Sequence, residues 1–184
     1  MEVALSQEVV GIIGLGPVGT IIGAFLAKSG VTVYGMDTSE ERVEQINSNG
    51  LVVRGFTDLD VLIERCYSKI SQLAEVKDLT ALFVCTKTWA IDPVMNAINM
   101  CRWPENMRVV AFMNGVGPED AIGELIDKSK VSRGVANFAG NITGRRAARG
   151  THAMVQTLVH LCCHRRGGCR HSDRHPPRDP ERTC

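Results

Sequence analysis

Short runs of apolar residues alternate along this chain with longer stretches in which apolar residues recur at helical spacing. Such alternation is typical of βαβ units, in which parallel strands are joined by crossover helices. The first apolar run, 9–14, leads into a helical stretch at 18–29 that Gly30 ends. The pattern predicts an α/β fold with a doubly wound parallel sheet of about five or six strands.

Turn and helix-start signals set the expected boundaries of the other elements. Thr38, followed three residues later by Glu41, predicts a capping box at the start of the second helix. Pro93 and Pro118 lie where prolines often begin helices. We expect strands at 9–14, 31–37, 51–54, 66–70, 81–86, 108–113 and 131–138, and helices at 18–29, 38–49, 94–100 and 119–126.

The junction between the first strand and the first helix reads Gly14-Leu15-Gly16-Pro17-Val18-Gly19. The first glycine allows a tight turn, the second lets the backbone approach a pyrophosphate, and the third lets the helix pack closely on the sheet. Free N–H groups at the helix start would face the phosphates. In this strand–helix context the six residues predict a dinucleotide-binding site, with a glycine-rich turn of another α/β protein as the alternative.

An acidic residue, Asp37, ends the second apolar run, 18 positions after Gly19. A carboxylate at this position accepts hydrogen bonds from the adenosine ribose hydroxyls and repels a 2′-phosphate. The sequence therefore predicts NAD(P)H as the cofactor, with a preference for NADH. Arg42, one turn into the next helix, is a candidate partner for a phosphate and would weaken that preference.

Charge divides the chain into two parts. Residues 1–144 contain 12 Lys and Arg against 17 Asp and Glu, whereas residues 145–184 contain 9 Arg against 3 acidic residues, together with all five His. Beyond Cys162 there is no hydrophobic periodicity that could build a core. We predict a dinucleotide-binding domain over 8–144 and an atypical basic tail over 145–184 that is disordered or read out of frame.

Two more specific roles for the tail are a metal site and a contact with nucleic acid. Its His and Cys residues are numerous, but they lack the paired C-x₂-C spacing of zinc sites, so we expect no metal. Because no aromatic residue follows Phe138 to stack on bases, we expect no specific nucleic-acid partner.

Features elsewhere in the chain favour the cytoplasm. Cys66, Cys85 and Cys101 are the cysteines of the first 144 residues, an odd number without paired spacing, which suits a reducing compartment. No basic segment precedes the first apolar run, and no run reaches about 20 apolar residues, so we expect neither a signal peptide nor a membrane span.

Two further segments follow strands that should lie near the middle of the sheet. Lys87 ends the segment Val84-Cys85-Thr86-Lys87, and Asn114 begins the segment Asn114-Gly115-Val116-Gly117. Ligands of open parallel sheets bind beyond the carboxyl ends of the strands, so Lys87 and Asn114 should both lie at the cofactor edge. With the glycine pattern, these segments resemble the ketopantoate reductase (2-dehydropantoate 2-reductase) family over about residues 8–144.

This resemblance implies NAD(P)H-dependent reduction of a 2-oxo acid, similar to 2-dehydropantoate, to a 2-hydroxy acid, as in pantothenate biosynthesis. It implies that Lys87 and Asn114 are catalytic and cofactor-binding residues beside the nicotinamide and the substrate, where a cation or an amide would stabilise charge on the ketone oxygen. A solvated loop lysine and a turn-forming Asn-Gly pair are the alternatives. The family usually uses NADPH, so Asp37 is a departure from its pattern.

Nothing after Gly144 resembles the helical C-terminal domain of the family, which carries its general-acid lysine and contacts between subunits. We therefore expect a truncated or frameshifted member that carries mainly the cofactor-binding half and has little activity alone, with a homodimer as the expected assembly of the intact enzyme. The alternative is a stand-alone NAD-binding module that senses redox state or binds a partner without turnover.

Overall fold

The computed structural model describes residues 8–55, 57–113, 118–136, 138, 140–143, 152–155 and 162–164. Seven of the described strands form a central sheet: β1 (Val9–Ile13), β2 (Thr32–Met36), β5 (Arg65–Tyr67), β6 (Ala81–Val84), β7 (Arg108–Ala111), β8 (Val131–Val135) and β11 (Cys162–His164).

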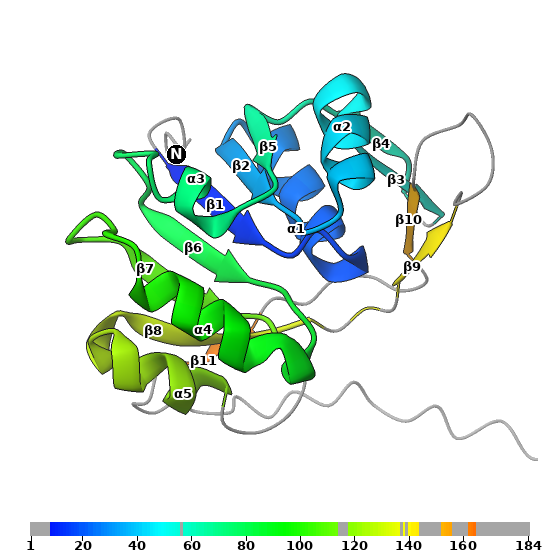
Figure 1. Cartoon of the computed structure of the whole chain (residues 1–184). Coiled ribbons are helices and arrows are strands. Elements are labelled where there is room, and N and C mark those ends of the chain that lie inside the picture. The colour runs from blue at the N-terminus through cyan, green and yellow to red at the C-terminus, as the bar shows by residue number, and fades with distance from the viewer. Residues whose placement is uncertain are drawn as a thin grey trace, which may run out of the picture.

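The strand order of this sheet is β11-β8-β7-β6-β1-β2-β5 (Figure 1). Neighbouring strands from β8 to β5 are parallel, and β11 is antiparallel to β8. The first strand of the chain therefore lies in the middle, with β2 and β5 on one side and β6, β7 and β8 on the other. This is the order of a dinucleotide-binding Rossmann fold, and it confirms the predicted parallel sheet.

Helices cover both faces of the central sheet. Successive side chains of a strand point to opposite faces, so a continuous apolar run such as β1 presents apolar side chains on both of them. In β1, Val10 and Ile12 belong to one hydrophobic core, and Val9 and Ile13 belong to the other. The first core is shared with α1 (Pro17–Lys28) and α2 (Glu40–Asn49), and the second with α3 (Ile70–Leu73), α4 (Ile91–Asn99) and α5 (Pro118–Leu125).

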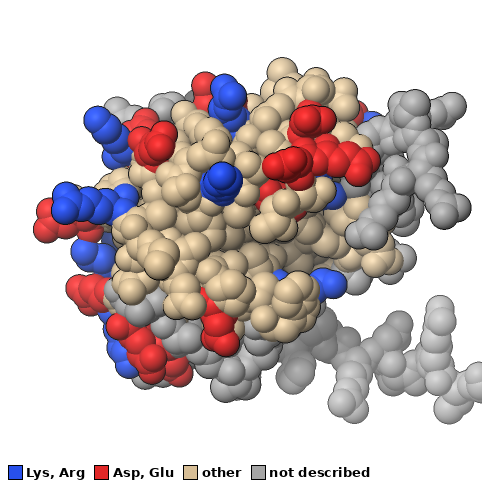
Figure 2. All heavy atoms as spheres, viewed as in Figure 1, with Lys and Arg blue, Asp and Glu red and all other residues tan. Residues whose placement is uncertain are grey.

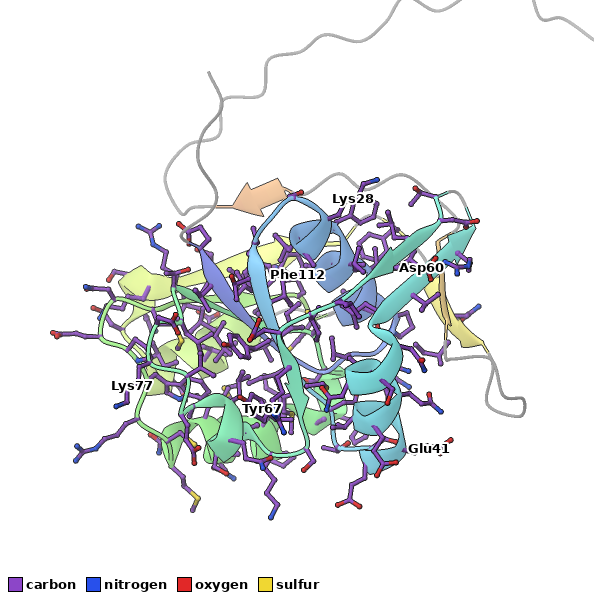
Figure 3. All side chains as sticks on the ribbon, turned by 90° about the horizontal axis from the view of Figure 1, so that it is seen from above. Lys28, Glu41, Asp60, Tyr67, Lys77 and Phe112 are labelled. Carbon is purple, nitrogen blue, oxygen red and sulfur yellow. The ribbon has the colours of Figure 1, made fainter. Side chains whose placement is uncertain are left out.

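Helix α1, which belongs to the first of these cores, lies behind the central sheet in the view of Figure 1. Phe112 packs in the same core against Phe83, with the ring centroids 5.3 Å apart. Figure 3 shows Phe112 in the interior, whereas Glu41 and Lys28, both exposed, point outward from their helices. In the described part of the chain, no helix has the length and apolar character needed to cross a membrane.

A second, four-stranded sheet packs against α1. The small sheet contributes Leu51 and Val53 to the core that α1 shares with the central sheet, so this helix contacts both sheets. The sequence pattern did not predict this sheet. Its strand order is β4 (Leu59–Val61), β3 (Leu51–Gly55), β10 (His152–Val155) and β9 (Gly140–Thr143), in which only β3 and β10 are parallel.

The second helix starts later than predicted and has a different cap. The N-cap of α2 is Ser39, whose hydroxyl accepts a hydrogen bond from the backbone N–H of Arg42 at 3.4 Å. The predicted capping box of Thr38 and Glu41 is therefore wrong. The reason is that Asp37 Oδ1 accepts the N–H of Ser39 at 3.0 Å, which forms a turn before the helix begins.

Other elements also differ from the prediction. The segment predicted as a strand at 66–70 divides, because β5 ends at Tyr67 and Ile70 begins α3. Strand β4 was missed, since three residues are too few to show alternation. Helix α4 begins at Ile91, which puts Pro93 in its first turn, where N–H groups have no partner within the helix and none is lost.

Two short strands, β10 and β11, come from the segment 145–184 that we predicted as a basic tail. One joins the small sheet and the other lies at an edge of the central sheet. The rest of that segment lies outside the described residues, so the boundary at residue 144 and the nature of the tail stay predictions.

Candidate functional site

The loops that carry the predicted site begin at one edge of the central sheet. Ile13 at the end of β1 lies opposite Met36 of β2 and Val84 of β6 in the strand register. The segments that follow these three strands therefore leave the sheet side by side. This is the carboxyl edge, where Rossmann folds bind their ligands.

The glycine-rich segment makes a turn that only glycine fits at two positions. Gly14 has a φ of 89°, and its N–H donates to the carbonyl oxygen of Met36 at 2.8 Å. A Cβ added to Gly19 would lie 2.1 Å from the carbonyl oxygen of Gly14. These two glycines let β1 pass directly into α1 while the turn stays hydrogen-bonded to β2.

Gly16 differs from both, because the space around it is open. It is the N-cap of α1, with a φ of −63° that any residue can adopt, and a Cβ there would meet nothing within 4 Å. No side chain caps the helix, and Pro17 at its first position has no N–H. The next N–H groups, those of Val18 and Gly19, have no partner within the helix and could bind a phosphate.

Asp37 follows β2 and is hydrogen-bonded to the glycine-rich loop. Its Oδ2 accepts the backbone N–H of Leu15 at 3.1 Å, and its Oδ1 accepts that of Ser39 at 3.0 Å. The N–H of Asp37 donates to the carbonyl oxygen of Tyr67, at the end of β5. The carboxylate is therefore held in one orientation beside the loop.

Arg42 from α2 reaches the same carboxylate. We call Asp37, Arg42 and Thr20 together the Asp37 cluster. Nε of Arg42 is 3.6 Å from Asp37 Oδ2, and Nη2 of Arg42 donates to Thr20 Oγ1 at 2.9 Å. The hydroxyl of Thr20 in turn donates to the carbonyl oxygen of Leu15 at 2.9 Å. The cluster thus ties α2 and the start of α1 to the glycine-rich loop.

Arg42 is a candidate phosphate partner from the sequence, whereas Thr20 is not predicted there as a member of the site. Thr20 is only 2% exposed, and it is a polar residue among the buried apolar residues of α1. A polar residue on the apolar face of a helix was the sequence signal that could have identified Thr20. The charged side chains of the cluster are also well covered, with Arg42 12% and Asp37 16% exposed.

Thr86, directly after β6 and Cys85, was also missed. Its Cγ2 would be 2.9 Å from a Cβ added to Gly14, so the side chain lies against the glycine-rich turn. Its hydroxyl oxygen is buried, and it has no hydrogen-bond partner among the residues that the structure describes. A buried hydroxyl without a partner is costly, and a ligand bound at this edge could supply one.

Lys87 lies at the predicted edge and is exposed to solvent. Its carbonyl oxygen accepts the N–H of Ala90 in a short 3₁₀ turn, which presents Trp89 with 81% of its surface exposed. Strands β6 and β7 are parallel neighbours, so the loop after β7 starts at this same edge. Asn114 in that loop lies outside the described residues, and its predicted position beside Lys87 stays a prediction.

The described residues at this edge include two buried cysteines, Cys66 and Cys85. Burial raises the pKa of the Cys66 thiol to about 12, with a further upward contribution from the charge of Asp37. Burial also raises the pKa of Cys85. Such thiols stay protonated at neutral pH and are poor nucleophiles. Within the described ranges, no three His, Cys, Asp or Glu side chains are grouped so that they could hold a metal ion.

These observations fit a dinucleotide. The open space at Gly16 gives a pyrophosphate room to approach the start of α1, and Asp37 can accept hydrogen bonds from a ribose. The buried hydroxyl of Thr86, beside the glycine-rich turn, could form a further hydrogen bond to the ligand. The residues present could therefore hold a dinucleotide cofactor along the edge formed by β2, β1 and β6.

Comparison with known proteins points in the same direction. The sequence model of the family described as ketopantoate reductase PanE/ApbA matches residues 10–160. The chain is 28% identical over 133 residues to the 2-dehydropantoate 2-reductase of Streptococcus pyogenes, which covers 72% of this chain and 42% of that relative. It thus spans about two fifths of the length of this curated relative.

Solved structures share the fold. The 2-dehydropantoate 2-reductase of Geobacter metallireducens superposes with a TM-score of 0.65 at 26% identity, covering 79% of this chain and 46% of that one. A D-mandelate dehydrogenase solved with NADH and anilino(oxo)acetate gives a TM-score of 0.65 at 21% identity, covering 81% of this chain and 45% of that one. The matches therefore span less than half of each of these two chains.

Proposed function

Because this chain belongs to the ketopantoate reductase family PanE/ApbA, we propose that it binds a nicotinamide dinucleotide and carries the cofactor-binding half of a 2-oxo acid reductase. The observation that carries this proposal is the hydrogen bond from Leu15 N–H to Asp37 Oδ2, because it joins the phosphate-binding turn to the ribose-binding acid. A site that is already ordered loses less entropy when its ligand binds.

The cofactor we favour is NADH. Asp37 presents a carboxylate where the adenosine ribose is expected, and a 2′-phosphate would meet a like charge. Figure 2 shows acidic side chains gathered over α2, whose first turn contains Glu40 and Glu41. These charges add to the repulsion of a second anionic group near Asp37. NADH also fits this fold in the D-mandelate dehydrogenase solved with it.

The substrate side of the proposal rests on Lys87. A bound NADH would supply a hydride to the ketone carbon of a 2-oxo acid. Negative charge would then develop on the substrate oxygen, where a lysine ammonium close to it would lower the barrier, and a proton taken up from water would complete the 2-hydroxy acid. Lys87 is exposed and follows the strand next to β1, so its side chain can reach a ligand at this edge. We propose 2-dehydropantoate or a similar 2-oxo acid as the substrate, with Asn114 as a second substrate-side group.

Titration of the full chain with NADH tests this function. Trp89 lies two residues after Lys87 and is exposed, so a cofactor bound there should quench its fluorescence with saturation. Trp103 follows α4, near the start of β7 at the opposite edge, and the variant Trp89→Phe should remove most of the change. NADH oxidation is then followed with 2-dehydropantoate and other 2-oxo acids, and Lys87→Ala should lower the rate by about tenfold or more without lowering the melting temperature.

The two halves of this proposal have separate outcomes. Saturable NADH binding with no oxidation by any 2-oxo acid would fit both a cofactor-binding half with little activity alone and a stand-alone NAD-binding module, and a protein partner that binds only when NADH is present would favour the module. An absence of saturable binding to a chain that melts cooperatively would contradict the proposed function as a whole.

Replacement of Thr86 by valine should affect stability and cofactor binding in opposite directions. Valine keeps the shape and removes a buried hydroxyl that has no partner among the described residues, so the free energy of unfolding should stay equal or rise by about 1 kcal/mol. If the hydroxyl binds the cofactor, NADH should bind about three- to tenfold more weakly, measured by calorimetric titration.

Thr80, at the other end of β6, is the matched control for Thr86→Val. Its hydroxyl accepts the N–H of Val9 at 3.2 Å and contacts Glu8 Oε2 at 2.5 Å. Thr80→Val should therefore lower stability and leave NADH binding unchanged. Equal NADH affinity in wild type and Thr86→Val would show that Thr86 does not touch the cofactor.

A further inference from the structure

We propose that Arg42 is a specificity-determining residue at the ribose end of this site. In the wild-type chain the Asp37 carboxylate is the counterion of the Arg42 guanidinium. Without that carboxylate, the 2′-phosphate of a bound nucleotide would take this role. This inference rests on the proposed function and extends it from Asp37, which excludes the phosphate, to a residue that would attract it. The wild-type preference then depends on a balance between two opposite charges in contact.

The geometry places the arginine against the acid rather than out in solvent. Nε of Arg42 is 3.6 Å from the same Oδ2 of Asp37 that accepts the N–H of Leu15. Its Nη2 donates to Thr20 Oγ1, so the guanidinium is held from two sides. An anion that took the place of the Asp37 carboxylate would lie within the same distance of this group.

Coverage of the pair makes this charge balance strong. Arg42 and Asp37 are 12% and 16% exposed, so solvent screens their interaction less than it screens a surface pair. A guanidinium so covered needs an anion beside it, because burial of an unpaired charge is costly. Removal of the Asp37 charge would therefore leave the Arg42 guanidinium without this counterion, and binding of another anion at the same place would become more favourable.

A nucleotide with a 2′-phosphate brings such an anion to the ribose. Arginine binds phosphate through a planar fork of N–H donors. In a chain with serine at position 37, the shorter side chain also leaves room for the phosphate. The acidic first turn of α2, Glu40 and Glu41, opposes this attraction but is exposed and therefore more strongly screened.

Four chains test the inference: wild type, Asp37→Ser, Arg42→Gln and the double variant. Calorimetric titration measures the dissociation constants of NADH and NADPH, and those of 5′-AMP and adenosine 2′,5′-bisphosphate, which differ by the 2′-phosphate alone. We expect wild type to prefer NADH and Asp37→Ser to prefer NADPH, with a change in the affinity ratio on the order of a hundredfold.

The expected result for Arg42 distinguishes the inference from a role of Asp37 alone. Arg42→Gln should widen the wild-type preference for NADH by about tenfold, because Asp37 then repels the phosphate without a neighbouring cation. The double variant should lose the gain for NADPH that Asp37→Ser shows, and Asp37→Ser with Arg42→Lys should recover part of it. The gain in NADPH affinity of Asp37→Ser should also become smaller as salt is raised from about 50 to about 500 mM, because salt screens the contact between the arginine and the phosphate.

Controls keep the result interpretable. Arg54 forms an ion pair with Asp60 on the small sheet at 2.7 Å, so Arg54→Gln removes an arginine of another pair and should leave the NADH to NADPH ratio unchanged. Melting curves identify variants that fail to fold, and Asp37→Asn replaces Asp37→Ser if the latter does. Equal NADPH affinity in Asp37→Ser and in the double variant would overturn the inference alone, whereas no binding of either nucleotide to folded wild type would overturn the proposed function and the inference with it.

Discussion

Replacement of Gly19 by alanine should both destabilise the chain and abolish cofactor binding. In an ordinary helix this change is stabilising by about 1 kcal/mol, because glycine is a poor helix former. Here the new Cβ would lie 2.1 Å from the carbonyl oxygen of Gly14, and neither atom is at the end of a flexible side chain. The turn and the helix start must therefore move apart, at a cost of about 2–4 kcal/mol.

The displacement also reaches the atoms that would bind the pyrophosphate. Gly14 N–H is hydrogen-bonded to Met36, and Leu15 N–H to Asp37, so a shift of the turn disturbs both bonds. We expect a melting temperature lower by about 5–15 °C and NADH binding weaker by about a hundredfold or more. A Gly19→Ala chain with wild-type melting temperature would contradict the geometry of the turn.

Replacement of Gly16 by alanine should weaken cofactor binding without destabilising the chain. The backbone at Gly16 has a φ that alanine adopts readily, and nothing lies within 4 Å of the position of the new Cβ. Stability should change by less than about 1 kcal/mol, the difference between glycine and alanine as N-caps. The methyl group would stand in the open space at the helix start, where a pyrophosphate must approach the backbone.

The two alanine variants are each other's controls, since the substitution is the same and the positions are three residues apart at the start of α1. Thermal unfolding and NADH titration of both should give a loss of stability at Gly19 alone and a loss of affinity of at least about tenfold at both. Wild-type affinity in Gly16→Ala would mean that no phosphate approaches this helix start, and the cofactor proposal would then fail at its central contact.

Much of the central sheet could be predicted from the sequence, because both faces of its strands are covered. Buried strands such as β1 and β6 appear as short apolar runs, and the helices between them bury one face each. The small sheet could not be predicted in this way. Strand β4 has three residues, and β3 pairs with β10 from a distant part of the chain, so no local pattern records their contact.

The site divides along a similar line. The glycine positions and Asp37 could be predicted, because a tight turn, a close approach and a ribose contact each restrict the residue type. The partners Thr20 and Arg42 are 22 positions apart in the chain, and their hydrogen bond depends on how α1 and α2 pack. Thr86 looks like the end of an apolar strand, and only the structure shows that its hydroxyl is buried beside the glycine-rich turn.

The position of β1 at the centre of the sheet affects how the chain folds during synthesis. Its neighbour β2 follows after one helix, but its other neighbour, β6, is made only after β3, β4, β5 and α3. Until β6 emerges from the ribosome, β1 has an open and apolar edge, which is prone to pair with other chains. The pairing of β1 with β6 closes a long loop, and such distant contacts slow folding. Nucleotide binding could not stabilise the chain before this pairing forms, because the segment after β6 is part of the proposed binding site.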